Sequence, residues 1–372
     1  MKKILIICFV ALGCITGSGF ASTIDITDMA GRKLTVPYKP EKIICIGPGA
    51  LRLIVYLQAH GKLAGVEDME KLHPGGRPYR LANPEFAGLP RIGPGGAASI
   101  NKKPDLEAVL SVNPDLIFIT QYDVSLADSL QKQLNIPVVI LSYGALATFD
   151  QLTIYESLRL AGKILDRNKR AKAVIDFIES AAEELSNRTK NIEDKEKPNV
   201  FVGGISMRGS QGIESSEKNY IPLKWVNARN IVENILASKI NTMASKGSRT
   251  EGSHIFLDKE TLLSLNPDII FIDGGGVKLI EQDIIKKPEY YRALKAFEKK
   301  RVYVLLPFNF YTTNIETALA DAFAIAKILY PEQFKDIDAE KKCDEIYTFM
   351  VGKPVYSQMK KDFGKIGGIY EF

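Results

Sequence analysis

Several residues of this chain have the chemistry needed to hold an anion. Arg77 and Arg80 lie with His73 and Tyr79 in LHPGGRPYR, a segment rich in Gly and Pro with little apolar pattern. A guanidinium presents a planar fork of N–H donors that matches a carboxylate or an oxyanion. Tyrosine and histidine can ligate ferric iron or hydrogen-bond an anion. Each arginine alone would fit a surface salt bridge, but as a group they favour an anionic ligand.

Two more arginines end a pair of similar segments. The last residue of KIICIGPGALR is Arg52, and the last residue of PNVFVGGISMR is Arg208. Each segment reads as a short apolar strand, then small residues, then arginine. Gly47 opens the small-residue loop of the first segment. Such a loop lets a ligand approach backbone N–H groups at the start of the next helix, although a plain tight turn explains it equally well.

The second half of the chain adds candidates of mixed type. Trp225 and Arg229 lie in YIPLKWVNARN, and His254 and Tyr311 follow further on. Tyr311 comes after the apolar run VYVLLP and before the start of a helix. The carboxyl end of a parallel strand is where α/β folds bind ligands, so this place suits a ligand contact. Trp225 would serve equally well as a core residue.

Known catalytic and cofactor patterns are missing. Gly47-Pro48-Gly49 starts a dinucleotide fingerprint, with Glu67 and Asp68 near the acidic spacing, but the third Gly is absent. No GxSxG, HExxH or P-loop occurs, and the 3 His are scattered, which argues against a zinc centre. The formal net charge is only +5, without a basic stripe that would suit nucleic acid. We therefore expect a non-enzymatic protein without a cofactor or a resident metal.

One segment of the sequence occurs twice in the chain. DLEAVLSVNPDLIFIT (105–120) and DKETLLSLNPDIIFID (258–273) are identical at ten of sixteen positions. In each copy a short helix is followed by Asn-Pro, which ends it because the residue before Pro avoids the helical region. The apolar run LIFI or IIFI does not alternate, so it predicts a parallel strand covered on both faces. The segments that end at Arg52 and Arg208 are collinear with this repeat.

The repeat predicts an α/β protein with two similar Rossmann-like lobes and a ligand cleft between them. We place the N-terminal lobe at 22–165, a connecting helix at 166–195 and the C-terminal lobe at 196–372. The connector has no Gly or Pro between Asn168 and Lys195, and it carries one apolar stripe, namely Ala171, Ile175, Ile178, Ala182 and Leu185. A stiff connector predicts small rocking motions of the lobes in place of wide hinging.

Residues 1–21 have the pattern of a signal peptide. Lys2 and Lys3 precede a short apolar run, and Gly19-Phe20-Ala21 resembles a cleavage site before Ser22. The apolar run is too short to span a bilayer. Ala11-Leu12-Gly13-Cys14 also resembles a lipobox, with Leu one place closer to the Cys than usual, so a lipid anchor on Cys14 stays an alternative. Either reading predicts export to the periplasm.

These features occur together in a known family. The chain resembles the periplasmic substrate-binding proteins of ABC importers, in the class whose lobes are joined by a single long helix. The resemblance covers nearly the whole mature chain, from TDMAGRKLTVPYKPEKIICIGPG through LDKETLLSLNPDIIFIDG to NIETALADAFAIAKILYP. This class is known for ferric siderophores, haem, vitamin B12 and, in some members, molybdate or tungstate. The resemblance implies a binding function without catalysis.

The resemblance also implies a role for the repeat. In this family a Glu on each lobe docks onto the membrane permease, seven residues before the Pro of the Asn-Pro-Asp segment. Glu107 and Glu260 stand at that spacing before Pro114 and Pro267. Each Glu would also be stable near a helix start without any partner, because the helix dipole favours negative charge there. Their matched places favour docking to a two-fold permease.

We therefore expect a monomeric periplasmic protein that delivers a small anionic or metal-containing ligand to an ABC permease. An iron complex of the ferric siderophore type is the first choice, on prevalence in the class that the chain resembles. Molybdate or tungstate is the alternative, because GGISMRGSQGI and VNARN look similar to the oxyanion-binding branch. A corrinoid or haem comes third. An exported enzyme or an interaction protein on the same lobes stays open as a different class.

Overall fold

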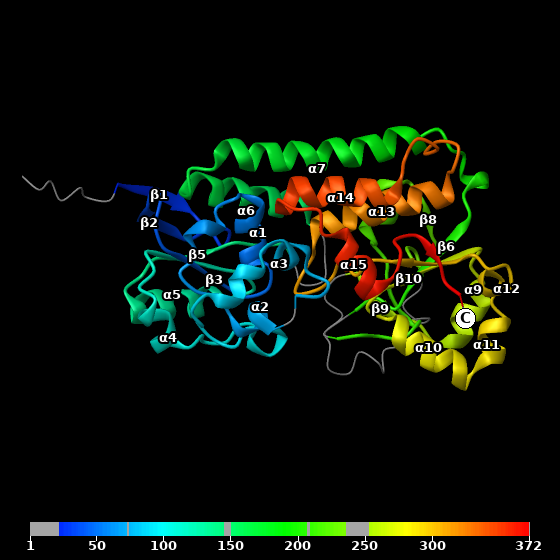
Figure 1. The fold of residues 1–372 in the computed structure, drawn as a ribbon, viewed down its shortest axis with the longest axis horizontal. Coiled ribbons are helices and arrows are strands. Elements are labelled where there is room, and N and C mark those ends of the chain that lie inside the picture. Colours follow the sequence, from blue (N-terminus) through cyan, green and yellow to red (C-terminus); the bar gives the residue numbers. More distant parts are fainter. Residues whose placement is uncertain (1–21, 73, 145–149, 207–208, 236–252, 372) are drawn as a thin grey trace, which may run out of the picture.

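Two α/β lobes stand side by side beneath one long helix (Figure 1). The computed structural model describes residues 22–72, 74–144, 150–206, 209–235 and 253–371. The signal peptide predicted at 1–21, with Cys14, lies outside this range. The predicted fold class, two lobes with parallel sheets, is confirmed. Within the described residues, no helix is both long enough and apolar enough to cross a membrane.

The sheet of the first lobe has three parallel strands in the order β3-β4-β5. All their residues are buried, as expected for apolar runs without alternation. A separate antiparallel hairpin, β1-β2, precedes them. The strands are β1 (Thr23–Thr27), β2 (Lys33–Pro37), β3 (Ile43–Ile46), β4 (Leu116–Ile119) and β5 (Val138–Ile140).

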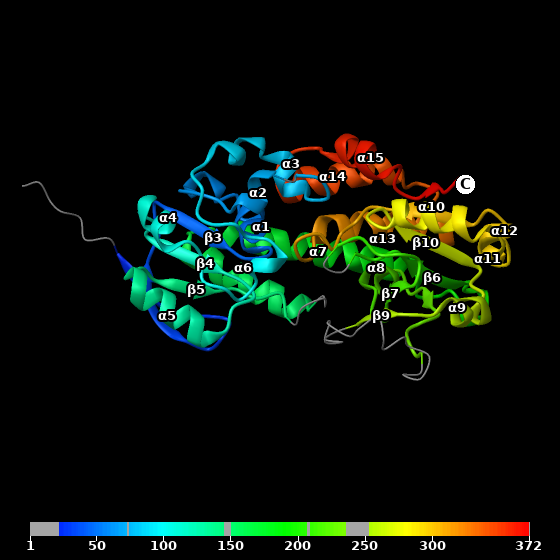
Figure 2. The same cartoon turned by 90° about the horizontal axis from the view of Figure 1, so that it is seen from below.

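Helices of the first lobe lie between and around these strands (Figure 2). They are α1 (Ala50–Tyr56), α2 (Asp68–Leu72), α3 (Pro78–Ala82), α4 (Leu106–Ser111), α5 (Val124–Leu134) and α6 (Gln151–Ile164). Short 3-10 helices occur at His60–Lys62, Pro84–Gly88 and Ala97–Ser99, and another at Asp194–Glu196 precedes the second lobe.

The sheet of the second lobe has the order β12-β11-β10-β6-β8, and only β12 runs antiparallel to its neighbour. A small antiparallel pair, β7-β9, lies beside it. The strands are β6 (Asn199–Gly203), β7 (Ser215–Glu217), β8 (Arg229–Asn230), β9 (His254–Phe256), β10 (Ile269–Asp273), β11 (Val302–Leu305) and β12 (Gly368–Ile369). The helices are α8 (Ile221–Trp225), α9 (Lys259–Leu265), α10 (Val277–Lys286), α11 (Pro288–Arg292), α12 (Lys295–Glu298), α13 (Ile315–Leu329), α14 (Ala339–Val351) and α15 (Tyr356–Phe363).

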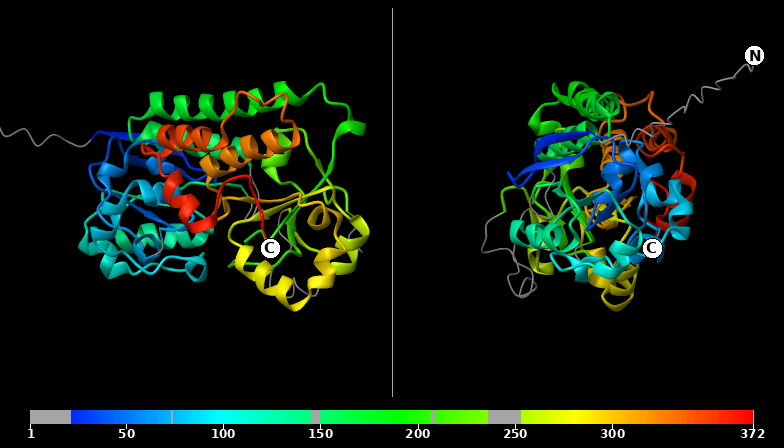
Figure 3. Two further views of the ribbon diagram at one scale, coloured as in Figure 1. Left: turned by 45° about the vertical axis from the view of Figure 1, so that its right-hand side comes forward. Right: turned by 90° about the vertical axis from the view of Figure 1, so that its left-hand side faces the viewer.

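The helix α7 (Asn168–Thr189) spans both lobes, with α13 and α14 beneath it (Figure 3). Its 22 residues give a length of about 33 Å. It packs on α6 of the first lobe and on α8 and α13 of the second. The helix α14 also contacts α1 and α3, so the C-terminal part of the chain returns to the first lobe. Helices from both halves of the chain therefore tie the lobes together.

The two faces of each sheet belong to different cores. Ile43 and Phe118 of the first sheet and Val200 and Phe271 of the second belong to one continuous cluster that also contains α7 and α13 residues. The opposite faces form a separate core in each lobe. Cys45 lies in the shared core as a buried free thiol, as the apolar run around it predicts. A core shared between the lobes favours small rocking motions.

The sequence repeat appears as a structural repeat. The helices α4 and α9 both begin at an aspartate cap, where Asp105 accepts from the backbone N–H of Ala108 and Asp258 from that of Thr261. Asn113 and Asn266, which precede the prolines, both have positive φ, 47° and 40°. Asparagine tolerates this conformation, and it turns the chain out of the helix and into the strand.

Candidate functional site

The loops after β3 and β11 meet where the two lobes join. Arg52, in α1 after the β3 loop, donates from Nη1 to the carbonyl of Thr313 at 2.9 Å and from Nη2 to those of Phe310 and Tyr311 at 3.0 and 3.1 Å. A Cβ on Gly49 would come within 2.4 Å of the Thr312 side chain. Both loops follow the carboxyl ends of parallel strands, the edge at which the sequence predicts a ligand.

Arg52 is fully buried, and its hydrogen bonds go to backbone carbonyls of the loop after β11. Its guanidinium also stacks over the Tyr79 ring, 4.9 Å from the centroid. Tyr311 and Thr312 both have positive φ, 55° and 66°, a conformation that costs a β-branched residue such as Thr312 free energy. Arg52 therefore stabilises a strained loop, while its role as a ligand contact stays a prediction.

The segment LHPGGRPYR, which is predicted to offer basic donors to a ligand, packs around the carboxylate of Glu70. Glu70 of α2 accepts from Arg77 Nη1 at 2.9 Å and from the Tyr79 hydroxyl at 2.8 Å, and Arg80 Nε lies 3.7 Å from the same carboxylate. Arg80 also donates to the backbone carbonyls of Glu70 and Asn83. All four side chains are buried. Two guanidinium groups share one carboxylate, so the cluster carries one excess positive charge.

Arg77 keeps donors that no described residue uses. Its Nε and Nη2 are buried and have no hydrogen-bond partner in the described part of the chain. The guanidinium lies 5.9 Å from the ring centroid of Phe310, which belongs to the loop of the other lobe. Because buried donors without acceptors cost free energy, such donors point to an oxygen supplied from outside the protein.

Tyr311 reaches across the lobe junction to a buried acid. Its hydroxyl donates to Glu67 Oε2 at 2.8 Å and accepts from the backbone N–H of Gly96 at 3.0 Å. The N–H of Gly47 donates to the same Glu67 oxygen at 3.2 Å. Burial raises the pKa of Glu67 to about 7, although the hydrogen bonds from Tyr311 and Gly47 oppose the shift. Two residues predicted as ligand contacts thus meet at one carboxyl group.

The backbone conformation at position 47 requires a glycine. Its φ is +90°, and a Cβ there would lie 2.5 Å from the carbonyl oxygen of Thr120. Only glycine fits such a turn without a shift of the neighbouring strand end. The Gly47 amide of this loop donates to Glu67 at the lobe junction, and its role as a ligand contact stays a prediction.

The candidates of the second lobe do not gather at this junction. Arg229 pairs with Asn199, the first residue of β6, so it lies at the opposite edge of the sheet and donates to the carbonyl of Asp194. Trp225 ends α8 inside the shared core. His254 on β9 is buried, 3.2 Å from Ser215 Oγ, and burial lowers its pKa to about 4. Their assignment as ligand contacts stays a prediction.

Two of the predicted site residues, His73 and Arg208, lie outside the described residues. Sequence reasoning missed Glu67 and Glu70 as site residues, although both stand within ten residues of Arg77. A buried guanidinium requires a counter-ion, so a carboxylate close to an arginine-rich segment is the only signal that sequence offers. Burial itself is not visible in the residue order.

Glu107 and Glu260 occupy equivalent exposed places on the two lobes. Each is the second helical residue after an aspartate cap, in α4 and α9 respectively. In α/β units a helix runs opposite to the strands that it connects, so its N-terminus lies at the carboxyl edge of the sheet. Both carboxylates therefore stand toward the edge that carries the ligand loops.

A second group of buried acids lies inside the second lobe. Asp273 ends β10, and its Oδ1 accepts from the N–H of Gly275 at 2.8 Å, while Asp321 Oδ1 accepts from the N–H of Leu306 at 3.0 Å. The other oxygen of each carboxyl is buried without a hydrogen-bond partner in the described chain. Burial raises the pKa of Asp273 to about 7, and the nearby Glu217 adds to the shift. Burial also raises the pKa of Asp321, and the nearby Asp273 adds to that shift.

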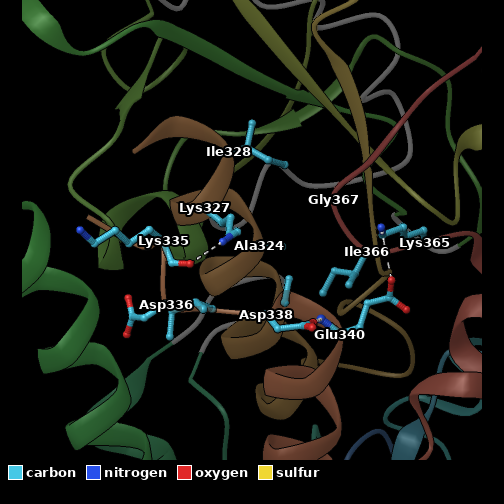
Figure 4. A pocket seen from close by; sticks show the side chains of 12 residues that line it. Ala324, Lys327, Ile328, Lys335, Asp336, Asp338, Glu340, Lys365, Ile366 and Gly367 are labelled. Atoms are coloured by element: carbon cyan, nitrogen blue, oxygen red, sulfur yellow. Dashed lines mark hydrogen bonds and ion pairs between the residues drawn. The ribbon is translucent and has the colours of Figure 1, made fainter. Parts of the chain in front are cut away.

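A groove of about 490 Å³ lies away from the lobe junction, toward the end of α13 (Figure 4). Two of its lysines have partners there, since Lys327 donates to the carbonyl of Lys335 and Lys365 lies 3.3 Å from Glu340. In the described part of the chain, no group of three or more His, Cys, Asp or Glu side chains is arranged to hold a metal ion.

Comparison with known proteins gives consistent matches over most of the chain. A family model described as periplasmic binding protein matches residues 43–307. The molybdate-binding protein MolA of Haemophilus influenzae is 23% identical over 365 residues, covering 93% of this chain and 95% of the relative. YvrC of Bacillus subtilis, described as an uncharacterized ABC transporter substrate-binding lipoprotein, is 21% identical and covers 85% of this chain and 88% of the relative.

Solved structures agree with the fold. MolA bound to molybdate superposes with a TM-score of 0.67 at 18% identity, covering 89% of this chain and 98% of that one. A protein of an ABC-type Fe3+-hydroxamate transport system from Saccharomonospora viridis gives a TM-score of 0.55 at 15% identity, covering 82% of this chain and 99% of that one. At such identities the likeness establishes the two-lobed architecture.

Proposed function

This chain belongs to the periplasmic binding protein family, and from that premise we propose that it captures a compact oxyanion of the molybdate or tungstate type. As a family member it is the substrate-binding component of an ABC importer and catalyses no reaction. The family role is thus established, and the identity of the ligand is what we propose. The resemblance of the sequence to its class favours an iron complex, and the buried charges at the lobe junction move our preference to the oxyanion.

The unused donors of Arg77 carry this proposal. Nε and Nη2 are buried at the junction of the lobes and find no acceptor among the described residues, and Glu70 balances only one of the two neighbouring guanidinium groups. A small anion would supply both the missing acceptors and the missing negative charge. The relative MolA, similar along nearly its whole length, is described as molybdate-binding, which supports the same class of ligand.

An iron complex remains the second candidate. It is supported by the structural likeness to the protein of an Fe3+-hydroxamate transport system. The two ligands differ in size, because an iron chelate needs a wide opening while a tetrahedral oxyanion fits among a few donors. We expect direct binding measurements to separate them.

The test is a titration of the mature protein by calorimetry, with Trp225 fluorescence as a second signal. The panel contains molybdate, tungstate, sulfate, a ferric hydroxamate and a ferric catecholate. We expect tight binding of molybdate or tungstate. Binding of an iron chelate alone would overturn the oxyanion proposal in favour of the second candidate.

Arg77→Lys tests the observation that carries the proposal. Lysine keeps the charge beside Glu70 but loses the planar fork, so we expect affinity for the oxyanion to fall at least tenfold, about 1.4 kcal/mol. Arg292→Lys is the matched control, because Arg292 has an exposed side chain that pairs only with Glu289. Unchanged affinity in a folded Arg77→Lys protein would remove Arg77 from the site.

A further inference from the structure

At Glu67, a donor from each lobe reaches the same side-chain oxygen. It precedes α2, only 5% of its surface is exposed, and its Oε2 accepts from Gly47 N–H and from the Tyr311 hydroxyl. Gly47 follows β3 of the first lobe, and Tyr311 follows β11 of the second. Both donors follow the carboxyl ends of their strands, where α/β folds bind ligands. Glu67 therefore lies at the junction where hydrogen-bond donors for an anion would be found.

The surroundings of Glu67 offer no compensating positive charge. The titratable groups that act on it are Tyr311 from the loop after β11 and Glu70 and Asp68 from α2. Tyr122 after β4 and Cys45 on β3 also feel its charge. Within the described residues Glu67 forms no ion pair with Lys, Arg or His, and the nearby Arg77 and Arg80 are directed at Glu70. An ionised Glu67 is therefore held by two hydrogen bonds alone.

Space around the carboxyl group is limited as well. A Cβ on Gly95 would lie 2.7 Å from the Glu67 Cβ and 3.1 Å from its Oε2. The loop through Gly95 and Gly96 therefore closes over Glu67 and holds it against Tyr311. Gly95 therefore limits the movement of the carboxyl group on this side, and burial favours its neutral form when further negative charge comes close.

We propose that Glu67 is a specificity-determining residue of the ligand site, which takes up one proton when an oxyanion binds and then donates its O–H to that oxyanion. This inference rests on the proposed function. The proton comes from solvent, no covalent bond to the ligand forms, and the charge of the buried site changes by one. A carboxylate beside a dianion would place like charges together, whereas a carboxylic acid adds a hydrogen-bond donor.

The raised pKa of Glu67, about 7, places this proton uptake in an accessible range. Near pH 7 the free protein holds the proton in about half of its molecules, and above pH 8 in few of them. Oxyanion affinity should then weaken as the pH rises above 7, approaching about tenfold per pH unit when a full proton is taken up.

The test is calorimetric titration of the full mature protein with molybdate, in pairs of buffers that differ in ionisation heat, between pH 6 and 8.5. For the unchanged protein we expect uptake of about half a proton at pH 7, rising toward one at pH 8.5. Glu67→Gln keeps a neutral donor at the same place, so it should take up no proton and bind with an affinity that is flat over this range. Glu156→Gln, at an exposed acid on α6, is the control that should match the unchanged protein.

The outcomes separate this inference from the proposed function. Failure of the unchanged protein to bind molybdate or tungstate at every pH would overturn the proposed function itself. Binding without proton uptake, equal in Glu67→Gln and the unchanged protein, would overturn only the role of Glu67. If circular dichroism shows that Glu67→Gln is unfolded, the pH dependence of molybdate binding is measured in Tyr311→Phe in its place. Loss of the tyrosine donor should raise the pH midpoint of binding, and an unchanged midpoint would contradict the inference.

Discussion

At the scale of single residues, the site depends on groups that the fold has buried. Arg52, Arg77 and Arg80 are each exposed by 2% or less, which is unusual for arginine. Each is held by protein acceptors, and only Arg77 keeps two donors without one among the described residues. The same residue type therefore positions a loop at Arg52 and, in our proposal, offers donors to a ligand at Arg77.

Gly47→Ala tests the backbone requirement of the ligand loop. A Cβ would meet the Thr120 carbonyl oxygen at 2.5 Å, and φ is +90°, so we expect the free energy of unfolding to fall by about 1–3 kcal/mol. Denaturant unfolding measures the change. Gly61→Ala is the matched control, because no atom lies within 4 Å of its added Cβ and its φ is not positive. Equal effects of both substitutions would contradict the argument.

At the scale of elements, two loops and a short helix decide the geometry of the junction. The loop from Leu306 to Asn314 joins β11 to α13, and α1 supplies Arg52 to three of its carbonyl groups. Asn314 adds a hydrogen bond from its amide to the carbonyl of Gly76. The loop of the second lobe is thus held by residues of the first, which is how a strained turn at Tyr311 persists.

Arg52→Lys should release this loop. An ammonium cannot reach three carbonyl groups at once, so buried hydrogen bonds from a charged donor are lost, and we expect a destabilisation of about 2 kcal/mol or more. Hydrogen exchange of residues 309–314 should become faster. Arg159→Lys, on the exposed face of α6, serves as the control. Unaltered exchange in Arg52→Lys would show that other contacts hold the loop.

At the scale of the whole molecule, the lobes share one core and one long helix, and each presents an exposed Glu at the same structural position. A two-fold permease can engage two such carboxylates only if their spacing is kept. The helices α7, α13 and α14, which pack across the junction, provide that rigidity. The duplicated segment thus gives each lobe one strand, β4 or β10, and one exposed Glu that we propose as a docking position.

The double variant Glu107→Gln, Glu260→Gln tests docking. We expect uptake by the reconstituted importer to be abolished while ligand affinity stays within about twofold, since both residues are exposed and do not contact the junction loops. Transport into proteoliposomes and calorimetry measure the two properties. Glu156→Gln should leave both unchanged. Normal transport by the double variant would refute docking through these residues.

Stability should also depend on pH through buried acids. Burial raises the pKa of Glu67, Glu217 and Asp273 to about 7, whereas these groups titrate near about 4 in an unfolded chain. The folded protein keeps protons that the unfolded chain gives up, so the free energy of unfolding should fall as pH rises from about 4.5 to 7, and then level off.

Asp273→Asn should reduce that decline, because the neutral amide has no charge to bury. Denaturant unfolding at pH 5, 6, 7 and 8 measures it, and Asp362→Asn, at an exposed acid of α15, should follow the unchanged protein. A free energy of unfolding that rises steadily from pH 5 to 7 in the unchanged protein would contradict the expectation.

The sequence by itself determined the two lobes, the strands of the repeat and the likeness to one family, because apolar runs, Asn-Pro stops and duplication are local patterns. It also pointed to Gly47 and Tyr311, since both follow parallel strands, at whose carboxyl ends α/β folds bind ligands. Only the tertiary structure decided what the arginines do. Burial and counter-ions are set by contacts between distant segments, such as Arg52 with Thr313 and Glu67 with Tyr311. No residue spacing records those contacts, so the acids that organise the junction became visible only in the fold.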